Sequence, residues 1–263
     1  MSQHRNYFMK KNIIGLIPTR LSSKRLYQKP LLEINKIPLI IHTYKRAKLS
    51  KKLDNVVICC DDRKIYDVVI KYTKDVIITS KINKNGTERI AEAYNKIKKR
   101  YDLVVDIQGD EPLINPSHID AVIDYHLKNI NVDIILPVLK IKDGSNINIV
   151  KVVVDKLWNV KYLSRSEIPH FFNKNKEFFY KHLSIISFKP KALNKFYLSS
   201  QQRLERIENV ELLRALEIGL NIKSFLVKGS SFSVDTIDDY LKAKRFMKKD
   251  KIFQLYVNKK NES

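Results

Sequence analysis

A basic loop that follows a short apolar run holds the side chains best suited to chemistry. Residues 13–17 are typical of a buried strand, and the loop after Pro18 brings four cations and three hydroxyl groups close together. These side chains are Arg20, Lys24, Arg25, Lys29, Thr19, Ser22 and Ser23. A loop fixed by a strand can offer N–H groups, hydroxyls and positive charge to the oxygens of a polyphosphate. A solvated basic loop explains this segment alone equally well.

Two aspartates stand at expected junctions between strands and helices, and both could hold a metal ion. Asp110 follows the apolar run 103–107, in the segment Gln108-Gly-Asp-Glu-Pro112, and Asp235 lies in Val234-Asp-Thr236. Mg²⁺ commonly takes one or two carboxylates beside phosphate oxygens and waters. Taken singly, an acidic turn and a helix N-cap are the simpler explanations. Beside the basic loop, the two acids predict a site in which cations bind phosphates and aspartates hold a metal.

A further helix start could contact a ligand. The segment Asn85-Gly-Thr-Glu-Arg89 opens a predicted helix, where free N–H groups could bind a base edge, ribose or carboxylate. An ordinary helix cap is the alternative. His182 could serve a substrate or could be a core residue. The sequence shows no Ser/His/Asp set, no zinc spacing and no glycine-rich dinucleotide or Walker loop.

The first half of the chain alternates strand and helix signals. Strands are predicted over 13–17, 56–60, 76–78, 103–107 and 132–138, and helices over 38–49, 63–72, 87–99 and 116–130. Short apolar runs between amphipathic helices predict an α/β fold with a mostly parallel sheet and helices on both faces. Ligands bind beyond the carboxyl ends of such strands, where residues 19–29, Asp61 and residues 108–112 would all lie.

The second half is richer in strand signals. It predicts strands over 149–156, 158–163, 180–188 and 223–227, a loop over 164–176, and helices over 204–220 and 236–248. Gly219 would end the first of these helices, and Thr236 or Asp235 would cap the second. We expect one domain over 13–249 with a β-rich insertion, a basic extension over 1–12 and a frayed basic tail over 250–263.

Composition limits the classes of function. The net charge of +22 comes from lysines spread along all 263 residues, without a nucleic-acid-binding motif, so we expect no specific nucleic-acid partner. The charge would still attract anionic small substrates. No apolar run approaches the ~18 residues of a membrane span, and none forms a signal peptide. The adjacent Cys59 and Cys60 suit a reducing compartment, so we expect a cytoplasmic protein without membrane insertion.

Several segments together resemble one family, the 3-deoxy-manno-octulosonate cytidylyltransferases (CMP-Kdo synthetases). They occur in the family's order and span residues 13 to about 240. The segments are Ile17-Pro-Thr-Arg20, Ser23-Lys-Arg-Leu26, Lys29-Pro-Leu31, Asn85-Gly-Thr-Glu-Arg-Ile-Ala-Glu92, Gln108-Gly-Asp-Glu-Pro-Leu113, Val150-Lys-Val-Val153, Tyr162-Leu-Ser-Arg165 with Ile168-Pro169, Lys181-His-Leu183 and Val234-Asp-Thr236.

The resemblance implies a single Rossmann-like nucleotidyltransferase domain and a homodimer built partly from the β-rich insertion, which would also bind sugar. It further implies dependence on Mg²⁺. The implied reaction joins CTP and a 3-deoxy-2-ulosonic acid, giving the CMP-sugar and pyrophosphate for lipopolysaccharide or surface-polysaccharide synthesis.

The resemblance also implies roles for individual residues. Arg20 and Lys29 would clamp the triphosphate with Ser23, beside Pro18 and Thr19, and Asp110 and Asp235 would hold Mg²⁺; the two cations and two acids would be catalytic. The residues along the nucleotide and sugar would be Asn85, Gly86, Thr87, Arg89 and Gln108. The residues facing the sugar acid would be Arg165, His182, Glu205 and Glu211.

Three departures from the family pattern bear on function. Tyr27-Gln28 replaces the Pro-Gly of a tight turn, Ile186 replaces a tyrosine, and Leu212 replaces a glutamine. The two aliphatic residues favour a less hydroxylated or differently substituted sugar acid. Two alternatives stay open: a cytidylyltransferase for a nine-carbon, sialic-acid-like sugar, against which Leu21-Ser22 counts in place of Gly-Gly, and a nucleotide-binding homologue without catalysis.

Overall fold

A ten-stranded mixed sheet forms the centre of the protein in the computed structural model. The structure describes residues 11–23, 25–172 and 177–257. Four parts of the chain lie outside the described residues. They are residues 1–10 of the predicted extension, Lys24, residues 173–176 of the predicted loop and residues 258–263 of the predicted tail. The strand order is β5-β4-β1-β6-β11-β7-β10-β8-β9, with β12 also paired to β7.

The N-terminal half of the sheet is parallel, as the sequence predicts. Its strands are β1 (Ile13–Thr19), β4 (Asn55–Cys60), β5 (Val76–Ile78) and β6 (Leu103–Ile107), and all their mutual pairings are parallel. The helices of this half are α1 (Leu39–Ala47), α2 (Arg63–Val69), α3 (Gly86–Lys96) and α4 (Pro116–Lys128). Each of these helices begins and ends within three residues of the predicted bounds.

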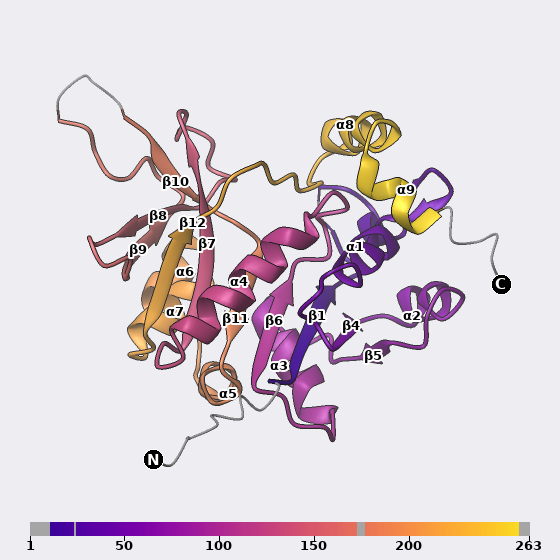
Figure 1. The fold of residues 1–263 in the computed structure, drawn as a ribbon, viewed down its shortest axis with the longest axis horizontal. Helices are drawn as coiled ribbons and strands as arrows, with labels where there is room; N and C mark the ends of the chain where they lie inside the picture. The colour runs from indigo at the N-terminus through magenta and orange to yellow at the C-terminus, as the bar shows by residue number, and fades with distance from the viewer. Residues whose placement is uncertain (1–10, 24, 173–176, 258–263) are drawn as a thin grey trace, which may run out of the picture.

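The second half extends the same sheet with shorter strands, on the left in Figure 1. They are β7 (Ile134–Ile141), β8 (Lys151–Val154), β9 (Val160–Ser164), β10 (Phe179–His182), β11 (Ile185–Phe188) and β12 (Ile222–Leu226). Only β12 pairs in parallel, with β7. Strands β10 and β11 both pair with β7 in antiparallel orientation. Strand β11 is also antiparallel to β6, so β6 and β7 run in the same direction. The predicted α/β class with a β-rich second half is therefore confirmed.

Two hydrophobic clusters cover opposite faces of the sheet. Ile14 and Leu16 join the cluster that includes Ile90 of α3, whereas Ile13 and Ile17 join the cluster that includes Ile119 of α4. Successive strand side chains point to opposite faces, so a strand covered on both sides is apolar throughout. This explains why the inner strands read as continuous apolar runs. No helix among the described residues is long and apolar enough to cross a membrane.

The single strand predicted over 180–188 is wrong, because the chain forms two strands there. β10 pairs with β7 and β8, and β11 pairs with β6 and β7. Between them, the Leu183 N–H donates to the Pro137 carbonyl at 3.1 Å. The chain changes neighbours at this point without any glycine or proline, so the apolar pattern alone conceals the break.

The long helix predicted over 204–220 is also wrong. Two short helices replace it, α6 (Arg203–Glu208) and α7 (Leu212–Glu217), with Asn209 between them at φ 51° and ψ 47°. Asparagine is among the few residues that adopt this left-handed conformation readily, and it ends a helix in the way glycine does. Gly219 follows α7 at φ 74°, as the sequence predicts for a helix end. Helix α5 (Pro190–Leu198) and the short hairpin β2 (Glu33–Ile34) with β3 (Ile37–Pro38) escaped the sequence analysis.

The predicted frayed tail is a packed helix over most of its described length. Helix α9 (Lys251–Val257) follows α8 (Ile237–Lys248) and buries Phe253 and Tyr256 against α1. The Tyr256 hydroxyl lies 2.7 Å from Nδ1 of His42, and the buried Arg46 forms an ion pair with Asp250. The domain therefore continues beyond residue 249, because apolar residues after the lysines complete a third hydrophobic cluster.

We expect Phe253→Ala to lower the free energy of unfolding by about 3 kcal/mol, because it leaves a cavity beneath α9. Leu255→Ala is the matched control, since Leu255 lies on the same helix with 57 % of its surface exposed. It should change the free energy of unfolding by less than about 0.5 kcal/mol. Denaturant titration measures both values, and equal effects of the two changes would show that α9 is not packed in solution.

Candidate active site

A cleft of about 1400 Å³ lies at the carboxyl ends of β1, β4 and β6. It brings together most of the residues predicted for the site. Its lining includes Pro18, Thr19, Arg20, Ser23, Lys29, Asn85, Gly86, Arg89, Gln108, Asp110, Arg165, His182, Glu205, Glu211 and Asp235. Thr87 is fully buried just behind this lining, where its N–H donates to Glu211 at 3.2 Å.

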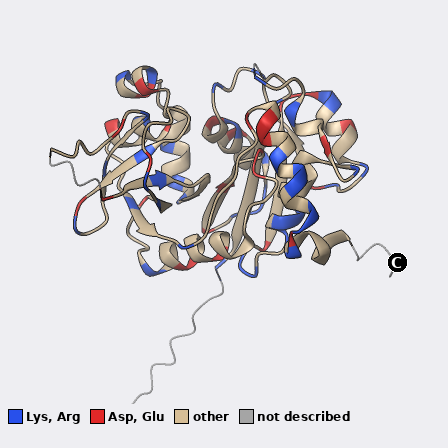
Figure 2. Cartoon of the chain, turned by 90° about the horizontal axis from the view of Figure 1, so that it is seen from above, with Lys and Arg blue, Asp and Glu red and all other residues tan. Residues whose placement is uncertain are grey.

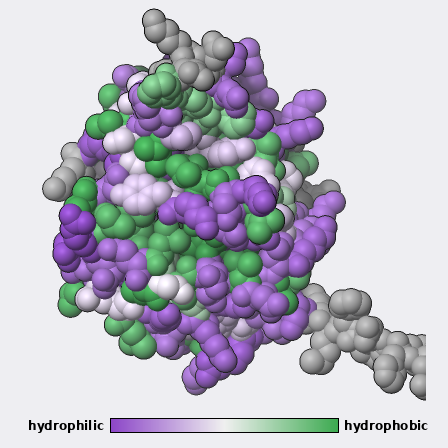
Figure 3. Space-filling view, turned by 90° about the vertical axis from the view of Figure 1, so that its left-hand side faces the viewer, coloured by the Kyte–Doolittle hydropathy of each residue, from purple (hydrophilic) through white to green (hydrophobic). Residues whose placement is uncertain are grey.

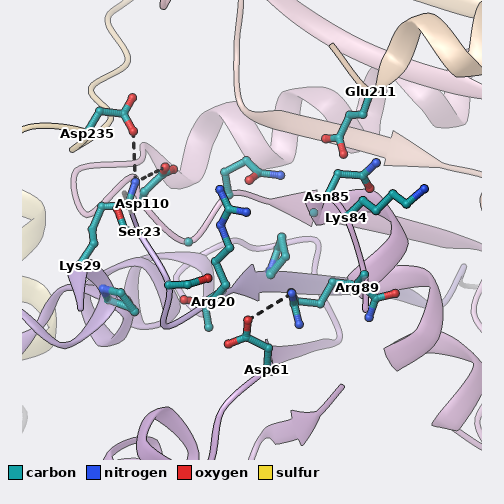
Figure 4. Close-up of a pocket in the computed structure, with 18 of the residues that line it drawn as sticks. Arg20, Ser23, Lys29, Asp61, Lys84, Asn85, Arg89, Asp110, Glu211 and Asp235 are labelled. Atoms are coloured by element: carbon teal, nitrogen blue, oxygen red, sulfur yellow. Dashed lines mark hydrogen bonds and ion pairs between the residues drawn. The ribbon is translucent and has the colours of Figure 1, made fainter. Parts of the chain in front are cut away.

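Lys29 bridges the two predicted metal-binding aspartates (Figure 4). Its Nζ lies 2.7 Å from Oδ2 of Asp110 and 3.2 Å from Oδ1 of Asp235. Arg25 also reaches Asp235, at 3.0 Å. Burial alone would lower the pKa of Lys29, but the charges of Asp110 and Asp235 and their hydrogen bonds outweigh it and raise the pKa. The lysine is therefore a firmly charged centre at this end of the cleft.

The donor set at this end suits a divalent cation. Asp110 and Asp235 come from different parts of the chain, and the Val234 N–H donates to the Asp110 carbonyl at 2.9 Å, which holds the two segments side by side. Two carboxylates next to a basic loop match the usual protein share of a Mg²⁺ site. Within the described part of the chain, no group of three or more His, Cys, Asp or Glu side chains could hold a metal unaided. A metal here would therefore need further ligands from a substrate.

The turn before Lys29 is formed even though it lacks Pro-Gly. The Lys29 N–H donates to the Leu26 carbonyl at 3.2 Å, and Gln28 takes the left-handed conformation at φ 47° and ψ 36°. Lys29 then begins the 3₁₀ helix η1 (Lys29–Leu31). The turn therefore forms without Pro-Gly. Its cost is that Gln28 adopts a left-handed backbone conformation, which glycine adopts with less strain.

Arg89 lies near the start of the basic loop after β1 and is almost fully buried. It donates to the Thr79 hydroxyl at 2.8 Å and pairs with Asp61 at 3.4 Å. Asp61 in turn accepts a hydrogen bond from the Leu21 N–H at 2.9 Å. The pair thus fixes the start of the loop. The sequence places Asp61 at the ligand-binding edge of the sheet, directly after β4, but assigns it no role in the site.

Two glycines allow segments of the cleft to approach closely. A Cβ atom on Gly109 would lie 2.7 Å from the Pro18 carbonyl oxygen, and one on Gly86 would lie 2.9 Å from Nε2 of Gln108. Distances below 3.0 Å are not tolerated, and the first contact involves backbone that cannot turn away. These glycines therefore set the spacing between the loops after β1 and β6 and the start of α3.

The start of α3 is tied to α6 and α7 by a buried network of charges. Arg214 donates to Glu205 at 2.6 and 2.7 Å and to Glu88 at 2.7 Å. Asn85 donates to Glu205 at 3.2 Å, and burial raises the pKa of the nearby Glu211. Glu205 is thus engaged within the protein, whereas the Glu211 carboxyl, which accepts the Thr87 N–H, also faces the cleft in Figure 4.

The far end of the cleft combines polar and apolar walls. The Arg165 guanidinium donates to the carbonyls of Ile147, Glu208 and Asn209 at 3.0 to 3.1 Å. Burial lowers the pKa of His182 to about 4, so its imidazole is neutral near pH 7. Ile186 and Leu212 line the same region. Arg165 therefore both shapes these loops and presents its remaining N–H groups.

Cations outnumber acids around the mouth of the cleft. Besides Arg20 and Arg25, the lining includes Lys64, Lys81 and Lys84, which the sequence analysis did not select. Lysine and arginine are also present on both halves of the molecule in Figure 2, in agreement with their even spread along the sequence. The mouth thus favours the approach of an anionic substrate.

A basic loop after the first parallel strand, with its lysine bound to a pair of aspartates at one end of a cleft, is typical of a nucleotidyltransferase. A family model described as cytidylyltransferase matches residues 14–224. The chain therefore belongs to the cytidylyltransferases and, with its similarities to curated proteins, to the family of 3-deoxy-manno-octulosonate cytidylyltransferases.

The similarity extends over most of the chain. The chain is 39% identical over 245 residues to "3-deoxy-manno-octulosonate cytidylyltransferase, mitochondrial" of Arabidopsis thaliana, covering 90% of this chain and 83% of that protein. It is 41% identical over 242 residues to 3-deoxy-manno-octulosonate cytidylyltransferase of Thermodesulfovibrio yellowstonii, covering 86% and 94%.

A solved structure agrees with these matches. The CMP:2-keto-3-deoxy-manno-octonic acid synthetase complexed with CTP superimposes with a TM-score of 0.85 at 29% identity, covering 90% of this chain and 99% of that one. A 4-diphosphocytidyl-2C-methyl-D-erythritol synthase from Anaerococcus prevotii, at 16% identity and a TM-score of 0.63, shares the fold.

We expect Gln28→Gly to raise the free energy of unfolding slightly, by less than about 1 kcal/mol, because the left-handed backbone no longer strains a side chain. Gln28→Ala keeps that strain and should give no gain. Because the turn is already formed, CTP affinity should change less than about threefold. Thermal unfolding and calorimetry measure the two quantities. A large tightening of CTP binding would instead mean that the wild-type turn is loose.

Proposed function

We propose that the protein transfers CMP from CTP to the anomeric hydroxyl of a 3-deoxy-2-ulosonic acid, Kdo or a close variant, and releases pyrophosphate. This step would supply lipopolysaccharide or surface-polysaccharide synthesis. The observation that carries the proposal is the bridge from Lys29 to Asp110 and Asp235 inside a cationic cleft. The names of the relatives and the bound CTP of the similar structure support the donor and the acceptor.

The cations of the loop after β1 would bind the triphosphate. Arg20 is exposed at the cleft and Arg25 lies beside Asp235, so both can reach phosphate oxygens. Ser23 adds a hydroxyl, although it now accepts a bond from the Leu26 N–H at 3.3 Å. Charge that is already in position needs little reorganisation when pyrophosphate leaves. Each well-aimed group lowers the activation free energy by about 3–4 kcal/mol.

Asp110 and Asp235 would hold Mg²⁺ next to the reacting phosphate. When bound, the ion neutralises charge on the phosphate oxygens. Lys29 now neutralises both carboxylates, so it would turn toward phosphate oxygens when the site is loaded. The two aspartates keep their spacing meanwhile because backbone hydrogen bonding joins their segments.

The sugar acid would lie at the far end of the cleft. His182, Arg165, Gln108 and Glu211 line it there and would orient the anomeric hydroxyl for in-line attack on the α-phosphorus. No protein nucleophile is required. Ile186 and Leu212 form an apolar part of this wall, which favours an acceptor with fewer or different substituents at the position they face.

A homodimer is part of the proposal. Apolar side chains gather on the face in Figure 3, on the side of β8, β9 and β10. Tyr180 packs against the tilted ring of Trp158 and edge-on against Phe178 in this region, at 5.5 and 5.2 Å between ring centroids, and all three are only half-buried. Burying such rings against a second copy would be favourable.

The buried free thiols of Cys59 and Cys60 support a reducing, cytoplasmic setting.

Light scattering should give a mass twice the 30.9 kDa of the chain. Tyr180→Glu should halve that mass, because it places a charge among the rings. Tyr72→Glu, an exposed tyrosine on the other half of the molecule, should leave it unchanged. The thermal midpoint of each variant checks its folding. A folded Tyr180→Glu variant that keeps the doubled mass would move the interface elsewhere.

Asp110→Asn and Asp235→Asn should each lower turnover by about 10²–10³-fold without unfolding the protein, because each removes a charge that orders metal and phosphate. Pyrophosphate release from CTP and Kdo at saturating Mg²⁺ measures this. Asp238→Asn, an exposed acid three residues from Asp235, is the control and should keep wild-type turnover.

Unchanged turnover in either variant would remove its residue from the metal site. A wild-type protein that released pyrophosphate with a nine-carbon sugar acid but not with Kdo would redirect the proposal to that acceptor. Binding of CTP without pyrophosphate release from any ulosonic acid would support a homologue without catalysis.

A further inference from the structure

Asp106 is a buried acid for which the proposed reaction gives no use. It lies in β6 among apolar residues and has no exposed surface. The register places it beside Leu16 of β1 and Ile186 of β11, both of which belong to the cluster on the α3 face of the sheet. A carboxyl group in such a place needs a reason, because burial of an unpaired charge is costly.

Among the residues that the structure describes, Asp106 has no positive partner. Its Oδ2 lies 2.9 Å from Nε2 of Gln108, and its Oδ1 has no hydrogen-bond partner within the described residues. The titratable groups that face it are Glu211 at the start of α7, Asp110 after β6 and the thiol of Cys59 in β4. The nearby cations are engaged elsewhere, Arg89 with Asp61 and Arg214 with Glu88 and Glu205.

These surroundings favour the neutral acid. Burial, then the charge of Glu211, raises the pKa of Asp106 well above its usual value, against the lowering effect of the bond from Gln108. A neutral carboxyl carries one O–H group, which must also find an acceptor. The only polar side chain bonded to Asp106 in the described structure is Gln108.

The Gln108 amide can meet this need by presenting its oxygen to Asp106. The two ends of an amide occupy nearly the same volume, so the same atomic positions accept either orientation. With Oε1 toward Asp106, the acid O–H donates to it across the 2.9 Å contact and no buried donor is left over. The amide NH₂ group then takes the other position, 3.4 Å from where a Cβ atom on Gly86 would lie, and Gln108 lines the cleft there.

We propose that Asp106 is a positioning residue: as a neutral acid it fixes the Gln108 amide so that its NH₂ group donates to an oxygen of the bound substrate. The proposal rests on the proposed function, because it takes the cleft as the substrate site. The acceptor oxygen belongs to CTP or to the sugar acid. Ionised Asp106 would instead accept from the amide and turn Oε1 toward the substrate, where two acceptors would meet.

The variants Asp106→Asn and Asp106→Leu distinguish the positioning of Gln108 from a role of Asp106 in packing alone. Asparagine can donate to Oε1 of Gln108 as the neutral acid does, so Asp106→Asn should keep turnover and KM within about threefold at neutral pH. Leucine cannot, so Asp106→Leu should raise the Kd of CTP or the KM of the sugar acid about tenfold. A change in CTP affinity by calorimetry assigns the acceptor oxygen to CTP, and a change confined to the sugar KM assigns it to the sugar.

The pH dependence supplies a readout that packing alone would not change. Wild-type affinity should fall as pH rises through the raised pKa of Asp106, and Asp106→Asn should not show this fall. Glu111, whose pKa burial raises to about 7, titrates in both proteins and cancels in the comparison.

Stability tests the same proton independently of activity. An unfolded aspartate ionises near pH 4, whereas native Asp106 keeps its proton, so wild-type stability falls as pH rises above that value. Asp106→Asn removes this loss, so its thermal midpoint should exceed that of the wild type at neutral pH, with the difference shrinking toward pH 4.

The outcomes are distinct. If Asp106→Asn loses affinity as much as Asp106→Leu while both stay folded, the carboxylate itself is required and the proposal is wrong. An unchanged pH profile and midpoint in Asp106→Asn would equally overturn it. If the wild type transfers nothing to any ulosonic acid but CTP affinity responds as expected, the proposed function fails and the positioning role stands.

Discussion

The charge balance between Lys29 and its two aspartates is the constraint on which the rest of the structure depends. Asp110 and Asp235 lie 81 and 206 residues along the chain from Lys29, yet all three meet at one end of the cleft. Two carboxylates held this close repel one another unless a cation lies between them. The ammonium group meets that need in the free protein, and we propose that a divalent cation bound with the triphosphate meets it during the reaction.

The C-terminal helices hold this meeting point together. One hydrophobic cluster contains Leu26 from the basic loop, Val234 next to Asp235, and Phe253 and Tyr256 from α9. A capping box between Thr236 and Asp239 fixes the start of α8 directly after the aspartate. The segment that composition marks as a tail is therefore a support for the site, and its lysines conceal the apolar residues that pack.

The sequence predicts most of the first half and little of the path of the second. Continuous apolar runs identify β1 and β6, which are buried on both faces, and also β4 beside them and the partly exposed edge strand β5. The same signal fails over 180–188, where the chain changes partners inside one apolar run, and Asn209 breaks a helical pattern through backbone conformation rather than hydropathy. Short motifs predict which residues line the cleft. They cannot show that Arg165 is bound to three carbonyls or that Asp106 lacks a counter-charge, because both depend on contacts distant in sequence.

The central claim is that the sugar hydroxyl attacks the α-phosphorus of CTP and pyrophosphate leaves. Phosphorus NMR of the protein with CTP, Kdo and Mg²⁺ tests it directly. The account predicts that a phosphodiester signal of the CMP-sugar and the signal of pyrophosphate rise together in equal amounts, and only when the acceptor is present. Free CMP with pyrophosphate, or pyrophosphate formed without acceptor, would contradict it.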